Sequence, residues 1–264
     1  MKLEDIKRHW EESGARFPYG GAVTPTSRDP FLGELERRNV LDFLRPGFAC
    51  LEVGCGDAFH TLRYASSVAS LCAIDLAESL VAVARRRLSE QQIDNVELQV
   101  ASVLDTASAW PGRRFDCAIS QRCLINLPEW RYQEDAILQI ADRLTDGGWF
   151  LLTEGFQEPL DRLNELRARF GLPEIVTVDY NRNLVRRDFE RFIAEHFEIV
   201  ERRHYGAYVF LSRLYHPLAV WPDPPVHDSR LNEAAMRLAS ALVMPDLEQY
   251  SYVLFYALRK RARG

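Results

Sequence analysis

The chain has 264 residues, of which 47% are hydrophobic and 27% are charged, and this length suits one large α/β domain. Its formal net charge is −5, so no overall basic field draws it toward the phosphates of duplex nucleic acid. No apolar run approaches the roughly 18 residues that a membrane span needs, and the first residues lack the pattern of a signal peptide. We therefore expect a cytoplasmic protein with neither a membrane nor a duplex nucleic acid as partner.

Residues 17–30 are rich in glycine, proline, serine and threonine, which predicts an irregular loop or lid. A helix should follow, because Asp29 can cap it and Pro30 suits its first turn. The five cysteines are odd in number and include no CxxC pair. We expect buried free thiols and no metal site.

Strand-like apolar runs recur seven times after this helix, over 49–53, 71–75, 96–100, 115–120, 149–154, 196–202 and 252–258. Helical patterns lie between the first five runs, over 60–68, 78–91 and 132–144. This alternation predicts βαβ units, and therefore a doubly wound α/β fold with a seven-stranded, mostly parallel sheet. About fifty residues with helical patterns separate the last two runs, which predicts a helical insertion near the C-terminus.

The first strand-like run leads directly into a glycine turn in the sequence LEVGCGDAF, residues 51–59. Gly54 and Gly56 allow a sharp turn and leave room for a ligand against the backbone. A dinucleotide-binding fingerprint would have a third glycine at position 59, where this chain has Phe59, and Asp57 would put negative charge beside the phosphates. The turn therefore favours a nucleotide-like ligand without phosphates.

The second strand-like run ends in Asp75, nineteen positions after Gly56. A carboxylate there can accept two hydrogen bonds from a ribose diol. The third run leads into residues 101–103, which are placed to contact an adenine edge.

In their order and spacing, LEVGCGDAF, the acid of CAID, FDCAIS and LTDGGWFLL resemble the class I S-adenosylmethionine-dependent methyltransferases. The resemblance is good over residues 30–155 and implies a Rossmann-like fold with S-adenosylmethionine as cofactor and S-adenosylhomocysteine as product. It implies that Gly54 and Gly56 approach the methionine part of the cofactor. It also implies that Asp75 holds the ribose and that Leu76 packs against adenine.

Further cofactor contacts follow from the same resemblance. Ser102 stands where an aspartate often meets the adenine amino group, and Val103 follows it. Ser120 and Gln121, at the end of the fourth strand, would lie beside the methionyl group. Glu52 is an acidic neighbour that the cationic cofactor tolerates.

The resemblance also divides the single predicted domain into parts: an N-terminal lid (1–30), a cofactor-binding core (31–155), acceptor-side helices with the insertion (156–250), and a closing strand and tail (251–264). In the lid, Tyr19 and Arg28 are expected to contact the cofactor. Arg28 is suited to pair with its carboxylate, although a solvated loop arginine is an equal interpretation.

Methyl transfer needs alignment of the two reactants and, for some acceptors, a base. Glu154 is the predicted base, because side chains at the carboxyl ends of parallel strands face the ligand crevice; a capping or salt-bridged carboxylate is the alternative. His204 and Tyr205 follow the sixth strand and are further candidates. His60, after the glycine turn, is interpreted as a solvated or capping histidine.

The leading hypothesis is methyl transfer to an oxygen or nitrogen of a small acceptor such as a sugar, glycan or secondary metabolite, with a weaker resemblance to glycan or natural-product tailoring methyltransferases. The residues after the fourth strand read Ser-Gln-Arg-Cys, not the Pro-Pro-aromatic motif of nucleic-acid amino methyltransferases. Two rivals are a non-catalytic cofactor-binding scaffold and an NAD-dependent oxidoreductase, the latter disfavoured by Phe59 and Asp57. The sequence leaves open whether the protein forms a homodimer.

Overall fold

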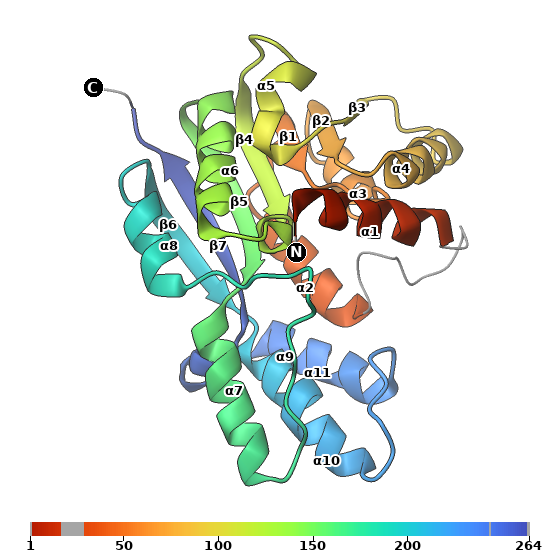
Figure 1. Ribbon diagram of the computed structural model, residues 1–264, viewed down its shortest axis with the longest axis vertical. Coiled ribbons are helices and arrows are strands. Elements are labelled where there is room, and N and C mark those ends of the chain that lie inside the picture. The colour runs from red at the N-terminus through yellow and green to blue at the C-terminus, as the bar shows by residue number, and fades with distance from the viewer. Residues whose placement is uncertain (1, 17–28, 243, 263–264) are drawn as a thin grey trace.

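A seven-stranded sheet runs through the centre of the molecule, and helices cover both of its faces (Figure 1). The computed structural model describes residues 2–16, 29–242 and 244–262. The strand order is β3-β2-β1-β4-β5-β7-β6, with β1 to β5 parallel and β7 antiparallel to both of its neighbours. The predicted sheet is confirmed, and its strands are β1 (Ala49–Val53), β2 (Ser70–Asp75), β3 (Val96–Val100), β4 (Phe115–Gln121), β5 (Leu144–Gly155), β6 (Phe197–His204) and β7 (Val253–Lys260).

Two apolar cores fill the space between the sheet and its helices. One core joins the sheet to α5, α6 and α8, and the other joins it to α2, α3 and the helical insertion. The helices are α1 (Leu3–Arg16), α2 (Pro30–Leu41), α3 (Thr61–Ala65), α4 (Glu78–Glu90), α5 (Thr106–Ala109), α6 (Trp130–Arg143), α7 (Gln157–Arg169), α8 (Arg186–Ile193), α9 (Gly206–Phe210), α10 (His216–Val220) and α11 (Arg230–Ala241). No helix in these ranges is long and apolar enough to cross a membrane.

The boundaries of β5 differ from the sequence prediction. The apolar run predicts a start at Trp149, but the strand begins at Leu144, which pairs with Phe115 of β4. The register then shifts, so that Cys117 pairs with Trp149. The extra residues of β5 between these pairs form an irregularity that contains Gly147 at φ +70°, a backbone conformation that glycine adopts without strain.

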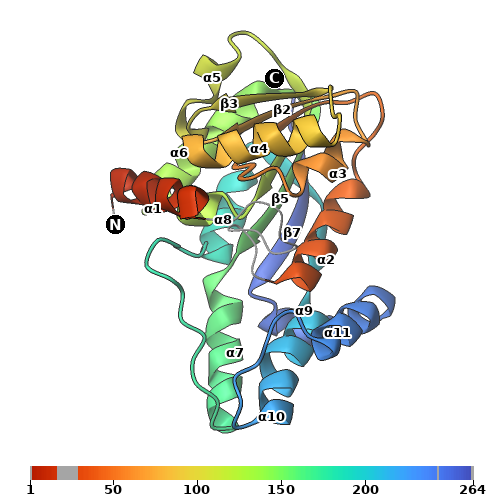
Figure 2. The same ribbon diagram turned by 90° about the vertical axis from the view of Figure 1, so that its right-hand side faces the viewer.

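The N-terminal helix α1 lies beside α4, as both views of the ribbon show (Figures 1 and 2). The Glu11 carboxylate accepts backbone N–H bonds from Glu78 at 2.7 Å and Ser79 at 3.0 Å, at the start of α4. A carboxylate is favoured there because the first N–H groups of a helix lack partners and carry partial positive charge. This contact fixes α1 over the carboxyl ends of the parallel strands.

The helical insertion, together with α7, forms a lobe beyond one end of the sheet (Figure 2). Asp29 ties the lobe to α2. It caps α2 by accepting the Leu32 N–H at 3.0 Å, as predicted, and it also accepts bonds from Tyr208 at 2.6 Å and Arg213 at 2.5 Å. The Arg213 guanidinium helps to keep the Asp29 pKa below its usual value despite burial. The lobe is therefore held against the start of the core by a buried ion pair.

Candidate functional site

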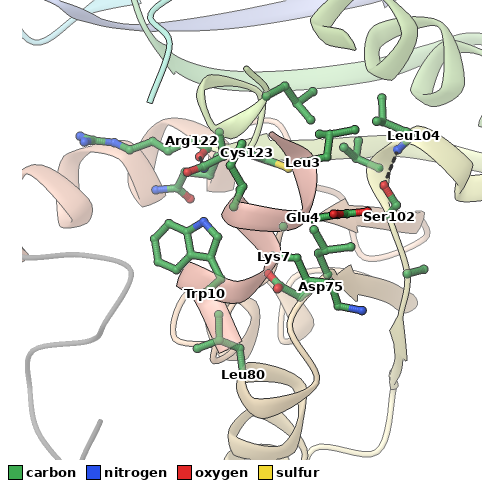
Figure 3. A pocket seen from close by; sticks show the side chains of 18 residues that line it. Leu3, Glu4, Lys7, Trp10, Asp75, Leu80, Ser102, Leu104, Arg122 and Cys123 are labelled. Atoms are coloured by element: carbon green, nitrogen blue, oxygen red, sulfur yellow. Dashed lines mark hydrogen bonds between the residues drawn. The ribbon is translucent and has the colours of Figure 1, made fainter. Parts of the chain in front are cut away.

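The first pocket lies at the carboxyl ends of β1, β2 and β4 and has a volume of about 280 Å³. Figure 3 shows Trp10 and Lys7 of α1 among the side chains that line it, with Asp75 beside Lys7. The crevice at the carboxyl ends of parallel strands is the usual ligand site of an open α/β sheet. Its lining includes Leu3, Ile6, Lys7, Trp10, Gly54, Asp75, Leu76, Ala101, Ser102, Val103, Gln121, Arg122 and Asn126.

The glycine turn brings backbone against this pocket. Gly54 and Gly56 have φ values of +71° and +55°, where other residues are strained. A Cβ at Gly54 would lie 2.8 Å from the Cys123 side chain. The turn therefore has no room for a side chain at Gly54, because Cys123 occupies that space. The close approach of a ligand to this backbone stays a prediction.

Asp75 both shapes the turn and faces the pocket. Its two carboxylate oxygens accept backbone N–H bonds from Gly56 at 2.8 Å and Ala77 at 2.9 Å. Burial raises the pKa of this carboxyl. Each carboxylate oxygen can accept a second bond, so the predicted contact with a ribose diol fits this position.

The predicted adenine side is assembled around Leu76, Ser102 and Val103, all of which line the first pocket. The Ser102 Oγ accepts the Leu104 N–H at 3.1 Å, which leaves its own hydroxyl proton for a ligand. The predicted lid contacts Tyr19 and Arg28 lie outside the described residues. Helix α1 lies within the predicted N-terminal lid (1–30) and lines the pocket, but its helical form and the contacts of Leu3, Lys7 and Trp10 were not predicted.

A second pocket of about 270 Å³ adjoins the first. The two share Trp10, Gly54, Gln121, Arg122 and Asn126. The rest of the second pocket combines rings and aliphatic side chains with charged groups, among them Leu32, Phe59, Ile125, Tyr180, Asp29, Glu36, Glu52, Asp57, His60 and Arg213. Two ligands held in these pockets would meet at the end of β4.

Gln121 and Arg122 are held at this junction by buried Glu36 of α2. Gln121 donates to Glu36 at 3.0 Å, and its Oε1 accepts from the Tyr64 hydroxyl at 2.7 Å. The Arg122 Nε donates to Glu36 at 3.0 Å, and this carboxylate helps to raise the Arg122 pKa. Arg122 has φ +54°, a conformation that costs a non-glycine residue about 1 kcal/mol or more and concentrates at functional sites.

Glu52 and His60 are ionisable groups with strongly shifted pKa values. Burial and the neighbouring charge of Asp75 raise the Glu52 pKa to about 7, and its Oε2 has no partner among the described residues. Burial and the charges of Arg37 and Arg122 lower the His60 pKa to about 3. His60 stands at the N-cap of α3 without making a side-chain cap bond, so the capping interpretation is wrong. It lines the second pocket as a neutral imidazole.

Glu154 does not reach either pocket. Its side chain is buried, and its carboxylate accepts bonds from Leu124 N–H at 2.8 Å, Ile125 N–H at 3.3 Å and the Ser120 hydroxyl at 3.2 Å. A general base must reach the proton that it removes, so this geometry is at odds with the predicted base. Glu154 instead fixes the loop after β4, which carries Arg122 and Cys123 into the first pocket. Ser120, predicted to meet the methionyl group, is likewise buried and bonded to Glu154.

The two other predicted catalytic residues also lie away from these pockets. The Tyr205 hydroxyl accepts from Asn39 at 2.8 Å, and its ring belongs to the core beside α2 and α9. The His204 Nδ1 accepts the Gly206 N–H at 3.2 Å. Neither lines the first or second pocket, because the end of β6 is at the far edge of the sheet from β1 and β2.

Comparisons with known proteins agree with this geometry. A family model described as a methyltransferase domain matches residues 50–148. The ubiquinone biosynthesis O-methyltransferase of Xanthomonas campestris is 38% identical over 135 residues, which is 51% of each chain. That of Xanthomonas oryzae is 30% identical over 180 residues, 68% of this chain and 66% of the relative. The chain belongs to the class I S-adenosylmethionine-dependent methyltransferases. It spans about half the length of the first curated relatives that it matches.

Solved methyltransferase structures share the fold. Magnesium protoporphyrin IX methyltransferase from Synechocystis PCC 6803 aligns with a TM-score of 0.64 and 12% identity, over 99% of this chain and 100% of that one. The N-methyltransferase NodS from Bradyrhizobium japonicum, in complex with S-adenosylhomocysteine, gives 0.57 and 14% over 98% and 99%. S-adenosylmethionine is the cofactor of this family, as predicted. The unpartnered Glu52 oxygen and the bare backbone at Gly54 fit a cationic ligand of this kind.

Proposed function

We propose that the protein transfers a methyl group from S-adenosylmethionine to an oxygen or nitrogen of a small acceptor such as a sugar, glycan or secondary metabolite. The observation that carries the proposal is the junction of the two pockets at Gly54, Gln121 and Arg122. The first pocket would hold the cofactor and the second the acceptor. An oxygen acceptor has additional support in the names of the curated relatives, which are O-methyltransferases.

The predicted contacts assign each part of the cofactor to the end of a different strand. Asp75 would hold the ribose, with Leu76, Ser102 and Val103 around the adenine. The backbone at Gly54, which lines both pockets, would face the methionine part, and the ammonium group of that part would extend to the Glu52 carboxylate in the second pocket. Gly56 lines neither pocket. Trp10 of α1 would cover the ligand and exclude water.

Bound S-adenosylmethionine supplies a methyl group on a positively charged sulfur, so the protein's task is chiefly to align the acceptor in line with that bond. Gln121 and Arg122 are rigidly held for this task by Glu36. Neutral His60 can accept a hydrogen bond from an acceptor hydroxyl. Its pKa of about 3 makes it a weak base, since a base works best with a pKa near the working pH.

A role without methyl transfer is the second candidate. A [4+2]-cyclase, SpnF, aligns with a TM-score of 0.60 at 18% identity over 99% of this chain, and this fold is therefore not confined to proteins named as methyltransferases. A scaffold would bind cofactor and transfer nothing. A homodimer and a cytoplasmic location stay predictions.

Calorimetric titration with S-adenosylhomocysteine, and with NAD for comparison, is the first test. We expect micromolar binding of the former and none of the latter. Transfer of a labelled methyl group to a panel of sugars, phenols and amines then separates an enzyme from a scaffold. Binding without transfer to any acceptor would favour the scaffold, and binding of NAD alone would overturn the proposal.

A further inference from the structure

A third cavity continues from the second pocket, away from the cofactor side. Its volume is about 170 Å³. The two spaces share Arg122, Ile125, Val178 and Asn181. The third cavity therefore adjoins the second pocket along these four residues.

The wall of the third cavity is mainly aliphatic, formed by Ile125, Leu160, Ile175, Val176, Val178 and Val253. Among its polar side chains, the Asn181 Oδ1, which also borders the second pocket, has no hydrogen-bond partner in the described part of the chain, whereas Asn183 and Tyr252 are paired with protein atoms. The Asn183 amide donates to Thr177 and to Gln157, each at 3.2 Å, and the Tyr252 hydroxyl accepts from Arg213 at 3.3 Å. Beyond Arg122 and Asn181, which border the second pocket, the surface left for a ligand is mainly apolar, and a polar group placed there would lose its hydration without finding a partner.

The segment between α7 and α8 carries apolar side chains to the mouth of this cavity. Val176 is 75% exposed and Val178 is 40% exposed. The same segment is anchored to the site, because Arg182 N–H donates to the Ile125 carbonyl at 2.6 Å and Tyr180 stacks on His9 of α1 with ring centroids 4.1 Å apart. The exposed valines thus lie on a segment that is fixed to the rest of the site by these contacts. Apolar side chains around a cavity are typical of ligand sites.

We propose that the third cavity is an acceptor subsite that takes an apolar substituent of the methyl acceptor. A cavity of about 150 Å³ holds one benzene molecule, so the substituent is about the size of a phenyl ring or a short branched alkyl chain. This inference rests on the proposed function, and it narrows the acceptor to an amphipathic molecule. The reacting oxygen or nitrogen lies in the second pocket, with Arg122 at the boundary, and the apolar part lies beyond Ile125.

The test measures binding of a 4-alkylphenol series, from phenol to 4-butylphenol, by calorimetry with and without saturating S-adenosylhomocysteine. Each added methylene that enters the cavity should tighten binding about fourfold. Val176→Trp should narrow the cavity and remove this gain, while Val200→Trp, on the exposed face of β6, is the matched control. Leu160→Ala enlarges the cavity, so the alkyl chain length that binds most tightly should be longer in this variant than in the wild type.

The proposal is supported if affinity rises with chain length in the wild type and Val200→Trp but not in Val176→Trp. It is overturned if chain length has no effect, if both tryptophan variants keep the same gain, or if 4-butylphenol does not bind up to its solubility limit. The S-adenosylhomocysteine titration is read separately. If the wild-type protein does not bind S-adenosylhomocysteine, the proposed function is refuted. The alkylphenol titrations made in the absence of S-adenosylhomocysteine still show whether the cavity binds an apolar group.

Discussion

Replacing Glu154 with glutamine should change how stability depends on pH. The folded-state pKa of about 7 lies above the usual 4.5, so between these values the folded protein binds more protons than the unfolded chain. Ionising Glu154 therefore lowers the free energy of unfolding as pH rises, by roughly 1 kcal/mol at pH 5 and roughly 3 kcal/mol at pH 8. Because the glutamine side chain does not titrate, the stability difference between the two proteins should shift by roughly 2 to 3 kcal/mol in favour of the variant over this range.

Urea denaturation followed by circular dichroism at pH 5, 6, 7 and 8 measures this difference. Other titrating groups, His60 among them, are common to both proteins and largely cancel. Glu165→Gln, at an exposed position on α7, is the control. Its difference in unfolding free energy from the wild type should not change with pH. If the stability difference between Glu154→Gln and the wild type does not change with pH, the reasoning is refuted. That result would mean that ionising the buried carboxylate does not destabilise the folded protein.

The same variant separates a positioning role from a catalytic one. Glutamine keeps one oxygen as an acceptor for Leu124 N–H and the Ser120 hydroxyl, but its amide opposes the Ile125 N–H. We therefore expect a modest loss of turnover and nearly unchanged affinity for S-adenosylhomocysteine. A loss of more than about a hundredfold in turnover, at normal stability and cofactor affinity, is the size expected for removal of a base and would restore that role.

Three other predictions concern the binding of the cofactor. Asp75→Asn should weaken S-adenosylhomocysteine binding about 10- to 100-fold in calorimetry, because a hydrogen bond to a charged group contributes roughly 1.5 to 3 kcal/mol; unchanged affinity would contradict the ribose contact. Binding of S-adenosylmethionine near pH 7 should release a proton from Glu52, since the positive charge of this ligand favours the ionised carboxylate. The affinity for S-adenosylmethionine should therefore rise about tenfold from pH 6 to pH 8. Calorimetric titrations in buffers of different ionisation enthalpy measure the number of protons released on binding. This proton release should be absent in Glu52→Gln. Trp10→Ala should weaken binding about tenfold through lost apolar contact with an unchanged far-ultraviolet spectrum; equal affinities would show that α1 does not cover the ligand.

The sheet and the glycine turn could be predicted from the sequence because both depend on local patterns. Apolar runs of strand length separated by amphipathic helices constrain the fold class. Gly54 and Gly56 are required by backbone conformation alone, and Asp75 follows from the end of the next strand. These features need no knowledge of distant contacts.

The side-chain directions at strand ends could not be predicted in the same way. Successive side chains of a strand point to opposite faces, and the position of Glu154 at the end of β5 did not reveal which face it takes. Its partners, Leu124 and Ile125, lie about thirty residues away in the chain. The place of α1 likewise depends on Glu11 meeting Ser79, 68 residues away, and nothing in the local pattern encodes that contact.

Arg122 shows why these distant contacts decide the function. It lines the first pocket, the second pocket and the third cavity. Its backbone is held in a left-handed conformation by a 2.8 Å bond from its N–H to the Thr153 carbonyl, and its side chain is held by Glu36. A glycine there would adopt this conformation without strain but would leave Glu36 buried without its cationic partner, which is costly. The strain is therefore offset by the ion pair, and the pair fixes the guanidinium at a point where a cofactor, an acceptor and an apolar substituent of that acceptor would all meet.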